Sequence, residues 1–497
     1  MKRLRVLARL WKMVAGLSLA VGAGGVVVCA AQTGGPVPAP VADPAIAAAL
    51  KAIDPAKVQA DIAKLVSFGT RSTISSMDTD QPSGQGINAA ADWVESEYKA
   101  ISADCGGCLD VKVDDFIEPA GKTPASRIPK PTRLRNIYAI LHGTAAGSQW
   151  VLVTGHYDSR ATDVMDSHVG APGANDDASG VAVSLECARA LSKMKFPATI
   201  VFVAVAGEEQ GLNGSGHLAK LAKAEGWPLE AVLNNDIVGG DTTPGATGQD
   251  KSVVRVFSES VPSSSTPEQV KAMLSLGAEN DSPSRELARQ IAELVPAYFK
   301  SSAKGAPPAG PGKMRSHIEV LVPAFHPVLI LRKDRFLRGG DHTSFNAEGF
   351  AAVRFTEWRE NFDHQHQKVR VDNGVQYGDL LQYVDFAYVA QVARMNAMTL
   401  ATLASAPSEP QEVHVLTGGL DNFSELTWKP AAFAPPGTTY EVVWRPTAEM
   451  LWTNAMSAGT ATRLKLDVSK DDVLFGVRAV DAAGHRSLAV PPVPARQ

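Results

Sequence analysis

Histidine and acidic residues follow three short apolar runs of the sequence. The segments are 155–159 (GHYDS), 206–211 (AGEEQG) and 234–239 (NNDIVG). A fourth segment, 174–180 (ANDDASG), lies at the start of an expected helix. Aspartate and serine often cap helices, but two adjacent aspartates in a glycine-flanked loop exceed what capping requires. Zinc accepts both imidazole nitrogen and carboxylate oxygen as ligands. The four segments therefore predict a metal centre.

The four segments carry enough carboxylates to hold two divalent cations. Two ions about 3.5–4 Å apart repel each other unless a carboxylate bridges them. One aspartate can supply that bridge, and one histidine and one carboxylate can complete the ligand set of each ion. Such ions lower the pKa of a water and polarise a scissile carbonyl. A glutamate that does not bind metal can then carry the proton to the leaving amine. The adjacent Glu208 and Glu209 offer one such base and one ligand.

Buried strands and amphipathic helices are expected to position these segments. The expected strands are 136–141, 150–154, 199–205, 231–233 and 351–355. The expected helices are 44–68, 87–101, 179–194, 284–299 and 380–403. Strands that alternate with helices indicate an α/β fold with a largely parallel sheet. Ligands of such sheets gather beyond the carboxyl ends of the strands, and the first three segments lie there.

Taken together, the four segments resemble the signature of the co-catalytic di-zinc exopeptidase family. This family includes bacterial leucyl aminopeptidases, glutamate carboxypeptidase and glutaminyl cyclase. The resemblance covers about residues 136–397 and extends along 207–215 (GEEQGLNGS). It implies a three-layer αβα domain over about 45–403 with a mostly parallel central sheet. It also implies two zinc ions per chain and peptide substrates.

The resemblance implies a role for each residue of the centre. Asp176 would bridge the two ions. His156 and Asp236 would bind one ion, and Glu209 would bind the other. Glu208 would be the general base.

Two further elements of the resemblance support the centre without binding metal. Asp158 would orient His156, because a carboxylate usually holds a metal-bound imidazole. The segment 340–345 (GDHTSF) resembles the family's Ser-Asp-His element and is expected to line the site.

The last ligand is expected in the segment 361–368 (NFDHQHQK). The family has a histidine here in a Tyr-His-Thr-like segment, and either His364 or His366 matches it. The tyrosine, which would stabilise the oxyanion, is missing. If His366 is the ligand, Gln365 could donate that hydrogen bond instead.

The N-terminus differs from the central domain. Basic residues at positions 2, 3, 5, 9 and 12 precede an uncharged apolar stretch at 14–28 and small residues at 29–31. This pattern is typical of a secretory signal peptide over residues 1–30, with lipidation of Cys29 as the alternative to simple cleavage. We therefore expect export to the periplasm or the extracellular space, without stable membrane insertion after cleavage. Residues 31–44, rich in Pro, Gly and Ala, are expected to be a linker.

The C-terminal part predicts a second domain. Residues 411–497 contain short alternating runs separated by turns, as in a small β-sandwich. This part resembles a fibronectin type III domain in 426–430 (LTWKP), 440–444 (YEVVW) and 477–481 (VRAVD). Such a sandwich could contact a protein or a surface.

Two features of the central domain carry structural expectations. The polar segment at about 260–313 is expected to be an insertion near the substrate entrance. Cys105 and Cys108 could form a disulfide, which export would permit. A redox-active pair and half of a zinc site are weaker readings of these cysteines, because no supporting strand or second pair accompanies them.

Charge and motif together narrow the function. The chain has 48 basic and 52 acidic side chains and no basic stripe of the kind that nucleic-acid binders carry. We expect an aminopeptidase. The alternatives are a carboxypeptidase of the same fold, a one-zinc glutaminyl cyclase, against which the full bridging set argues, and a catalytically silent peptide-binding protein. A carboxypeptidase needs arginines for the free carboxylate; Arg332, Arg335 and Arg338 could serve, although we expect a solvated loop there.

Overall fold

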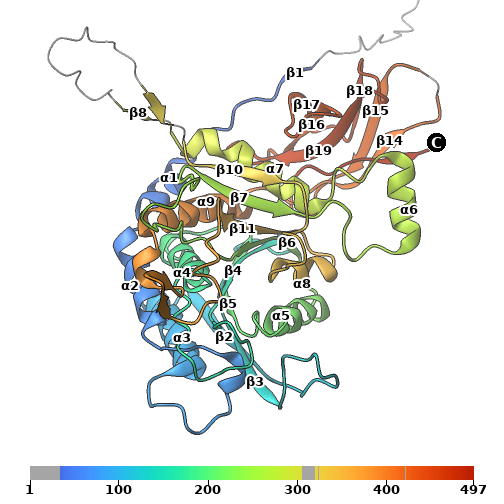
Figure 1. The fold of residues 1–497 in the computed structure, drawn as a ribbon. Coiled ribbons are helices and arrows are strands. Elements are labelled where there is room, and N and C mark those ends of the chain that lie inside the picture. Colours follow the sequence, from blue (N-terminus) through green and yellow to red (C-terminus); the bar gives the residue numbers. More distant parts are fainter. Residues whose placement is uncertain (1–33, 301, 305–319, 323, 420, 497) are drawn as a thin grey trace, which may run out of the picture.

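The computed structural model describes residues 34–300, 302–304, 320–322, 324–419 and 421–496 (Figure 1). The expected signal peptide with Cys29 lies outside these residues, so export and lipidation stay predictions. Residues 301 and 305–313 of the expected insertion lie outside them as well. Within the described part of the chain, no helix has both the length and the hydropathy to span a membrane.

An eight-stranded sheet forms the centre of the main domain (Figure 1). From edge to edge the strands are β10 (His326–Ile330), β7 (Val253–Ser258), β11 (Ala352–Glu357), β6 (Leu229–Asn235), β4 (Trp150–His156), β5 (Thr199–Val205), β3 (Thr132–Leu141) and β2 (Leu109–Glu118). The neighbours β11, β6, β4 and β5 are mutually parallel. The pairings β7/β11, β3/β5 and β2/β3 are antiparallel. The expected parallel arrangement therefore holds at the centre, and the sheet as a whole is mixed.

Helices cover both faces of this sheet. They are α1 (Pro44–Lys51), α2 (Pro55–Val66), α3 (Gly86–Asp104), α4 (Ala178–Leu191), α5 (Asn213–Ala224), α7 (Pro283–Tyr298), α8 (His342–Ala347) and α9 (Phe386–Ser405). The helix α6 (Pro267–Leu276) has no buried residue and lies away from the sheet, near the C-terminal strands (Figure 1). Successive residues of a strand point to opposite faces. Phe202 of β5 thus joins the core that contains α4 and α9, whereas Val203 joins the core that contains α5 and α8. This confirms the three-layer αβα fold.

Short elements complete the main domain. They are the 3-10 turns η1 (Thr73–Ser75) and η2 (Leu381–Tyr383) and the strand pairs β8 (Ser302–Lys304) with β9 (Val320–Val322) and β12 (Arg370–Asp372) with β13 (Val375–Tyr377). The disulfide that the sequence permits is formed: Cys105 and Cys108 are bonded, with Cα atoms 5.6 Å apart. It closes the turn between α3 and β2.

One expected helix was wrong for a local reason, and one helix was missed. The single helix expected over 44–68 is two helices, because Asp54 accepts from the backbone N–H of Ala56 and Pro55 starts a new helix. Proline lacks the N–H that an unbroken helix would need. Within the segment 260–313, the expectation missed α6, whose start carries a capping box between Thr266 and Gln269.

Two four-stranded sheets form the C-terminal β-sandwich. One sheet has the order β1 (Gly35–Pro36), β17 (Asn454–Gly459), β16 (Thr439–Pro446) and β19 (Val473–Val480). The other has the order β18 (Arg463–Leu466), β15 (Ser424–Lys429), β14 (Gln411–Leu416) and β20 (Val493–Ala495). Leu426 and Trp428 of one sheet share a core with Val442 and Val477 of the other. Strand β1 comes from the expected linker, so this segment is tied to the far end of the chain.

Buried charges join the sandwich to α7. Arg478 of β19 is 1% exposed and donates to Glu293 of α7 at 2.7 Å and to Glu441 of β16 at 2.8 Å. Trp452 donates from Nε1 to Glu286 of α7 at 3.1 Å. Burial raises the pKa of Glu286 to about 8, although Arg289 opposes that rise. The two domains therefore share a buried polar interface.

We expect Arg478→Met to lower the free energy of unfolding by about 3–5 kcal/mol, because it leaves Glu293 without its cation and Glu441 with Arg486 alone, at 3.7 Å. Urea denaturation followed by tryptophan fluorescence measures this. Arg463→Met is the matched control, since Arg463 pairs with Glu425 on the surface of the same sandwich, and it should leave the midpoint unchanged. Equal midpoints for the two variants would contradict a stabilising role for the interface.

Candidate metal centre

The sheet brings the predicted segments to one edge. Strand β4 lies between β5 and β6 and is parallel to both, so the carboxyl ends of the three strands are neighbours. His156 ends β4, Glu208 and Glu209 follow β5, and Asp236 follows β6. Asp176 lies just before α4, which follows β4 in the chain. Residues far apart in the sequence thus meet beyond three adjacent strand ends.

Five of these side chains form two groups that share Asp176. One group is His156, Asp176 and Asp236; the other is Asp176, Glu209 and His366. Oδ1 of Asp176 lies 3.2 Å from Nε2 of His156, and Oδ2 lies 2.9 Å from Nε2 of His366. His366 Nε2 also lies 3.3 Å from Oε2 of Glu209. Each oxygen of one carboxylate faces a different histidine, which is the arrangement that a bridging ligand requires.

The donor atoms of these groups fit zinc. Nε2 of His156 and Oε1 of Glu209 are buried, and neither has a hydrogen-bond partner among the described residues. Leaving a buried polar atom unpaired costs about 1–3 kcal/mol, so bound cations would satisfy both atoms. Ligands about 2.0–2.2 Å from a tetrahedral zinc lie roughly 3.3–3.6 Å apart, close to the separations observed here. Imidazole and carboxylate donors on both sides match zinc chemistry.

Asp158 holds the histidine and the glutamate pair in place. Its Oδ1 lies 3.3 Å from Nδ1 of His156. Its carboxylate also accepts from the backbone N–H groups of Glu208 and Glu209, at 3.3 and 3.2 Å, and from the hydroxyl of Thr73 at 2.9 Å. One buried carboxylate therefore positions His156 and both glutamates, in line with the orienting role expected for it.

Glu208 lies beside the two groups and belongs to neither. Its Oε2 is 4.0 Å from Nε2 of His156, and its side chain is 14% exposed to the cavity. Burial raises the pKa of Glu208 well above its usual range, and the charges of Asp236 and Glu209 add to the rise. A glutamate that lines the cavity beside both ligand groups and belongs to neither is placed to accept a proton.

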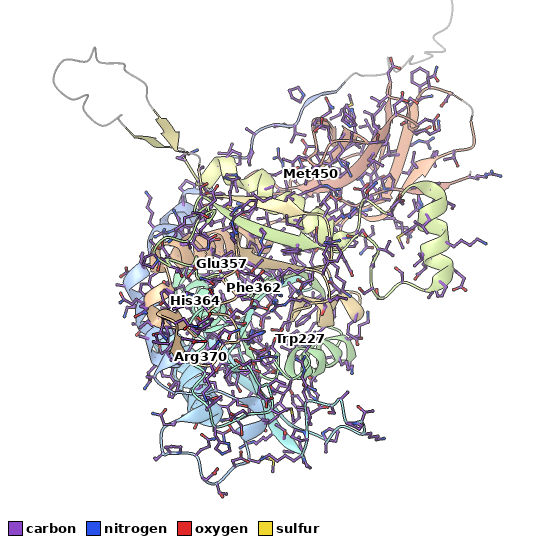
Figure 2. The ribbon with its side chains drawn as sticks, viewed as in Figure 1. Trp227, Glu357, Phe362, His364, Arg370 and Met450 are labelled. Atoms are coloured by element: carbon purple, nitrogen blue, oxygen red, sulfur yellow. A yellow bond between two sulfur atoms is a disulfide. The ribbon has the colours of Figure 1, made fainter. Side chains whose placement is uncertain are left out.

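The two candidate histidines of the segment 361–368 have different places. His366 reaches Asp176 and Glu209. His364, which is labelled in Figure 2, instead has its Nδ1 3.2 Å from Oδ1 of Asp241. The ring of His364 stacks on Tyr383, with centroids 3.9 Å apart. The structure therefore brings His366, and not His364, to the centre.

Gln365 contacts the centre from outside the cavity. Its Nε2 donates to Oδ2 of Asp176 at 3.2 Å, and its side chain is not among those that line the cavity. The substitute role expected for Gln365 at the oxyanion is not supported by this position.

Two aspartates that had no expected role of their own hold the ligands in place. Asp379 accepts from the backbone N–H groups of Asn175 and Asp176, at 2.9 and 2.7 Å. Asp177 accepts from the N–H of His156 at 3.0 Å and caps α4 through the N–H of Gly180 at 2.8 Å. The second aspartate of the 174–180 segment thus provides the cap, which leaves the first free for metal.

Arg354 supports Asp236 from the neighbouring strand. It is fully buried in β11, and its Nη2 lies 3.0 Å from Oδ2 of Asp236. Its Nη1 lies 3.3 Å from Asp334. The sequence could have indicated this role, because Arg354 is an arginine inside an otherwise apolar expected strand, and a buried charge needs a partner.

We expect Arg354→Met to weaken zinc binding by about 10- to 100-fold, the usual effect of removing a group that orients a metal ligand. Competition with a chromogenic chelator measures the affinity, and far-UV circular dichroism checks the fold. Arg354→Lys keeps the charge and should retain more of the affinity. Arg359→Met, in the exposed loop after β11, is the control. Unchanged affinity in folded Arg354→Met would contradict the supporting role.

A cavity of about 330 Å³ opens onto the centre. Asp176, Glu208, Glu209, Asp236 and His366 contribute to its wall. The other lining residues are Arg127, Arg160, Gly211, Leu212, Arg335, Leu337, Arg338 and Gly339.

Two expectations about this wall need correction. The segment 340–345 does not line the cavity: Asp341 and His342 are fully buried behind it, and residues 337–339 lie at the wall instead. The loop at 332–338 is largely exposed, as expected, but it is more than a solvated loop, because Arg335 and Arg338 also line the cavity while Arg332 does not.

Backbone strain is concentrated at the same place. Leu212, Leu337 and His366 line the cavity with φ values of 62°, 56° and 55°, and Ile237 beside Asp236 has a φ of 60°. L-residues with side chains rarely adopt this left-handed conformation, and such outliers cluster at functional sites.

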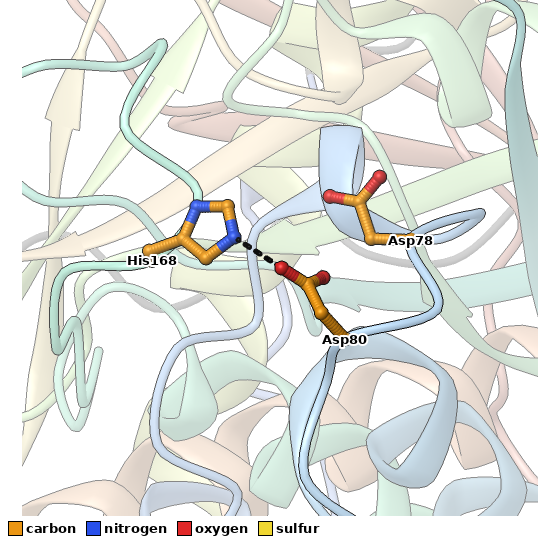
Figure 3. A group of neighbouring side chains, drawn as sticks. All are labelled: Asp78, Asp80 and His168. Carbon is orange, nitrogen blue, oxygen red and sulfur yellow. Dashed lines mark hydrogen bonds and ion pairs between the residues drawn. The ribbon is translucent and has the colours of Figure 1, made fainter.

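A third group of possible ligands lies on the surface. Asp78, Asp80 and His168 are neighbours, with Nε2 of His168 3.4 Å from Asp80 (Figure 3). Lys130 already pairs with Asp78, and Asp80 and His168 are exposed. This group lacks the burial and the unpaired donors of the centre.

Comparison with known proteins identifies the family. The model of peptidase family M28 matches residues 136–280. A probable zinc metalloprotease of Leptosphaeria maculans is 42% identical over 456 residues, which cover 92% of this chain and 98% of the relative. The chain belongs to peptidase family M28. A second probable zinc metalloprotease, from Pyricularia oryzae, is 42% identical over 464 residues and covers 92% of this M28 chain and 86% of the relative.

Two solved structures are similar to this chain at low identity. The LapA aminopeptidase of Legionella pneumophila has a TM-score of 0.48 and 20% identity and covers 72% of this M28 chain and 74% of its own. The glutaminyl cyclase of Porphyromonas gingivalis has a TM-score of 0.44 and 17% identity, with coverages of 70% and 97%.

Proposed function

We propose that this M28 protein is an exported exopeptidase that uses two zinc ions to remove single residues from peptides, most directly as an aminopeptidase. The observation that carries the proposal is the carboxylate of Asp176, whose two oxygens face His156 and His366 in two separate ligand groups. Glu208 adds an acid–base group at the same cavity. Export rests on the N-terminal sequence pattern alone.

We assign each residue of the centre a role. His156 and Asp236 would hold one ion, Glu209 and His366 the other, and Asp176 both. Zinc bound there would lower the pKa of a water and polarise the scissile carbonyl. Glu208 would accept the proton of the attacking water and return it to the leaving amine. Asp158 would keep His156 and Glu208 in register, because it contacts both.

A carboxypeptidase is the second candidate, and a specific observation favours it. Arg335 and Arg338 line the cavity, and guanidinium groups bind carboxylates such as a free peptide C-terminus. A one-zinc cyclase and a silent binding protein fit less well, since the two ligand groups and Glu208 are all present.

Product analysis by mass spectrometry tests the proposal. An unblocked peptide, its N-acetylated form and its C-terminally amidated form are incubated with zinc-loaded protein. We expect single residues to leave the N-terminus of the unblocked and amidated forms, and none to leave the acetylated form. Loss of residues from the C-terminus of the acetylated form would show a carboxypeptidase. Zinc-loaded protein that cleaves none of the three would overturn the proposed function.

A further inference from the structure

Cations dominate the cavity wall outside the metal centre. Four arginines line it, and Leu212 and Leu337 are the only apolar side chains of the described wall. Arg127 and Arg160 lie on the side of Glu209. Arg335 and Arg338 come from the loop before α8. A cavity of this composition offers little to an apolar side chain of a substrate.

The arginines before α8 exceed their counter-charges. Glu360 is shared by Arg255 at 2.9 Å, Arg335 at 2.5 Å and Arg338 at 3.9 Å. The other carboxylate beside Arg335, Asp334, also faces Arg354 at 3.3 Å. Among the three arginines that share Glu360, Arg338 is therefore the least neutralised, and its side chain remains 31% exposed.

Hydrogen bonds hold Arg338 close to the metal centre. Its Nη1 donates to Oε1 of Gln365 at 3.3 Å, and Nε2 of Gln365 donates to Asp176 at 3.2 Å. Only one amide side chain thus separates the guanidinium from the bridging carboxylate. The remaining guanidinium N–H groups of Arg338 donate to no described residue, and the side chain lines the cavity.

The arginines beside Glu209 also exceed their counter-charges. The carboxylate nearest to Arg160 is Glu209, whose Oε2 lies 3.8 Å from Nε, and Glu209 belongs to the metal centre. Arg127 donates to the backbone carbonyl of Glu209 at 3.0 Å and has no ion pair within the described residues. All four carboxylates of the wall (Asp176, Glu208, Glu209 and Asp236) serve the metals or the proton transfer.

We propose that this cavity recognises a carboxylate of the substrate close to the scissile bond, with Arg338 and Arg160 as the specificity residues. The inference rests on the proposed exopeptidase function and names its substrate class. A guanidinium binds a carboxylate through two parallel, charge-assisted hydrogen bonds. The carboxylate has two chemical sources, the side chain of a terminal Asp or Glu residue and the free C-terminus of a short peptide.

Paired substrates separate the two sources. The first pair is Glu- and Gln-p-nitroanilide, which differ in the side-chain charge alone. The second pair is one neutral peptide with a free and with an amidated C-terminus. We expect the charged member of one pair to have a kcat/KM about 10- to 100-fold higher than its neutral partner. A preference in the first pair assigns the side chain, and one in the second assigns the C-terminus.

Variants locate the recognition. Arg338→Gln and Arg160→Gln should each lower kcat/KM more for the charged member than for the neutral member, and so remove most of the preference. Arg332→Gln is the matched control, because Arg332 lies in the same loop, stacks on Phe336 with its guanidinium 3.7 Å from the ring centre, and does not line the cavity. It should keep the full preference.

Measuring peptide binding in a protein that cannot turn over substrate tests the carboxylate site independently of the proposed exopeptidase activity. The zinc-loaded Glu208→Gln protein is titrated by calorimetry with the free and amidated peptides and with peptides that begin with Glu or Gln. A tighter Kd for a charged member supports the carboxylate site even if no substrate is cleaved. Equal binding in both pairs overturns the inference, while hydrolysis of neutral substrates would leave the exopeptidase proposal intact.

Discussion

Glu208→Gln is expected to retain both zinc ions and to lose about 10²- to 10⁴-fold of turnover, the usual contribution of a general base. Glu208 lies beside the ligand groups without joining either, with Oε2 4.0 Å from Nε2 of His156. Glutamine keeps the size of the side chain and removes its ability to accept a proton. The variant should therefore lose proton transfer alone. The measurements are kcat on an aminoacyl-nitroanilide and zinc content by inductively coupled plasma mass spectrometry.

A distant glutamate controls for the substitution itself. Glu268, exposed in the first turn of α6, should tolerate the change to glutamine with kcat and zinc content unaltered. A Glu208→Gln protein with two zinc ions and wild-type kcat would show that the proton acceptor is another group. Loss of zinc in that variant would instead place Glu208 among the ligands.

Asp176→Ala should release metal and abolish activity, because both ligand groups depend on this one carboxylate. Its oxygens lie 3.2 Å from His156 and 2.9 Å from His366. Without the bridge, each ion keeps only two of its protein ligands, and the repulsion between two close cations is no longer offset. We expect zinc content to fall from two ions to less than one per chain after dialysis.

The surface provides the control for Asp176. Asp80→Ala changes an exposed aspartate of the group with Asp78 and His168, and it should leave zinc content and activity unaltered. A lower zinc content in Asp80→Ala would assign one ion to the surface group. Two ions retained by the Asp176→Ala protein would contradict a shared ligand.

The sequence predicted those residues of the centre that lie at the ends of neighbouring strands. Apolar runs that end in His156, Glu208, Glu209 and Asp236 were enough, because parallel strands place their carboxyl ends at one edge. Strand β5 was predicted with its exact bounds, since it is buried on both faces and reads as a continuous apolar run.

What remained open depends on contacts between distant segments. His364 and His366 are two residues apart in one polar loop, and only the fold shows that one meets Asp176 and the other Asp241. Asp379 acts on a loop about two hundred positions earlier in the chain. The sequence predicted only a solvated loop around Arg338, because a run of charged residues does not show which of its side chains faces a cavity.

Anomalous X-ray diffraction on both sides of the zinc absorption edge, from crystals of the zinc-loaded protein, tests the metal centre directly. Two peaks are expected, one between His156 and Asp236, the other between Glu209 and His366, with the carboxylate of Asp176 shared by both. A single peak, or a pair in which either ion lies away from Asp176, would contradict the two-zinc centre.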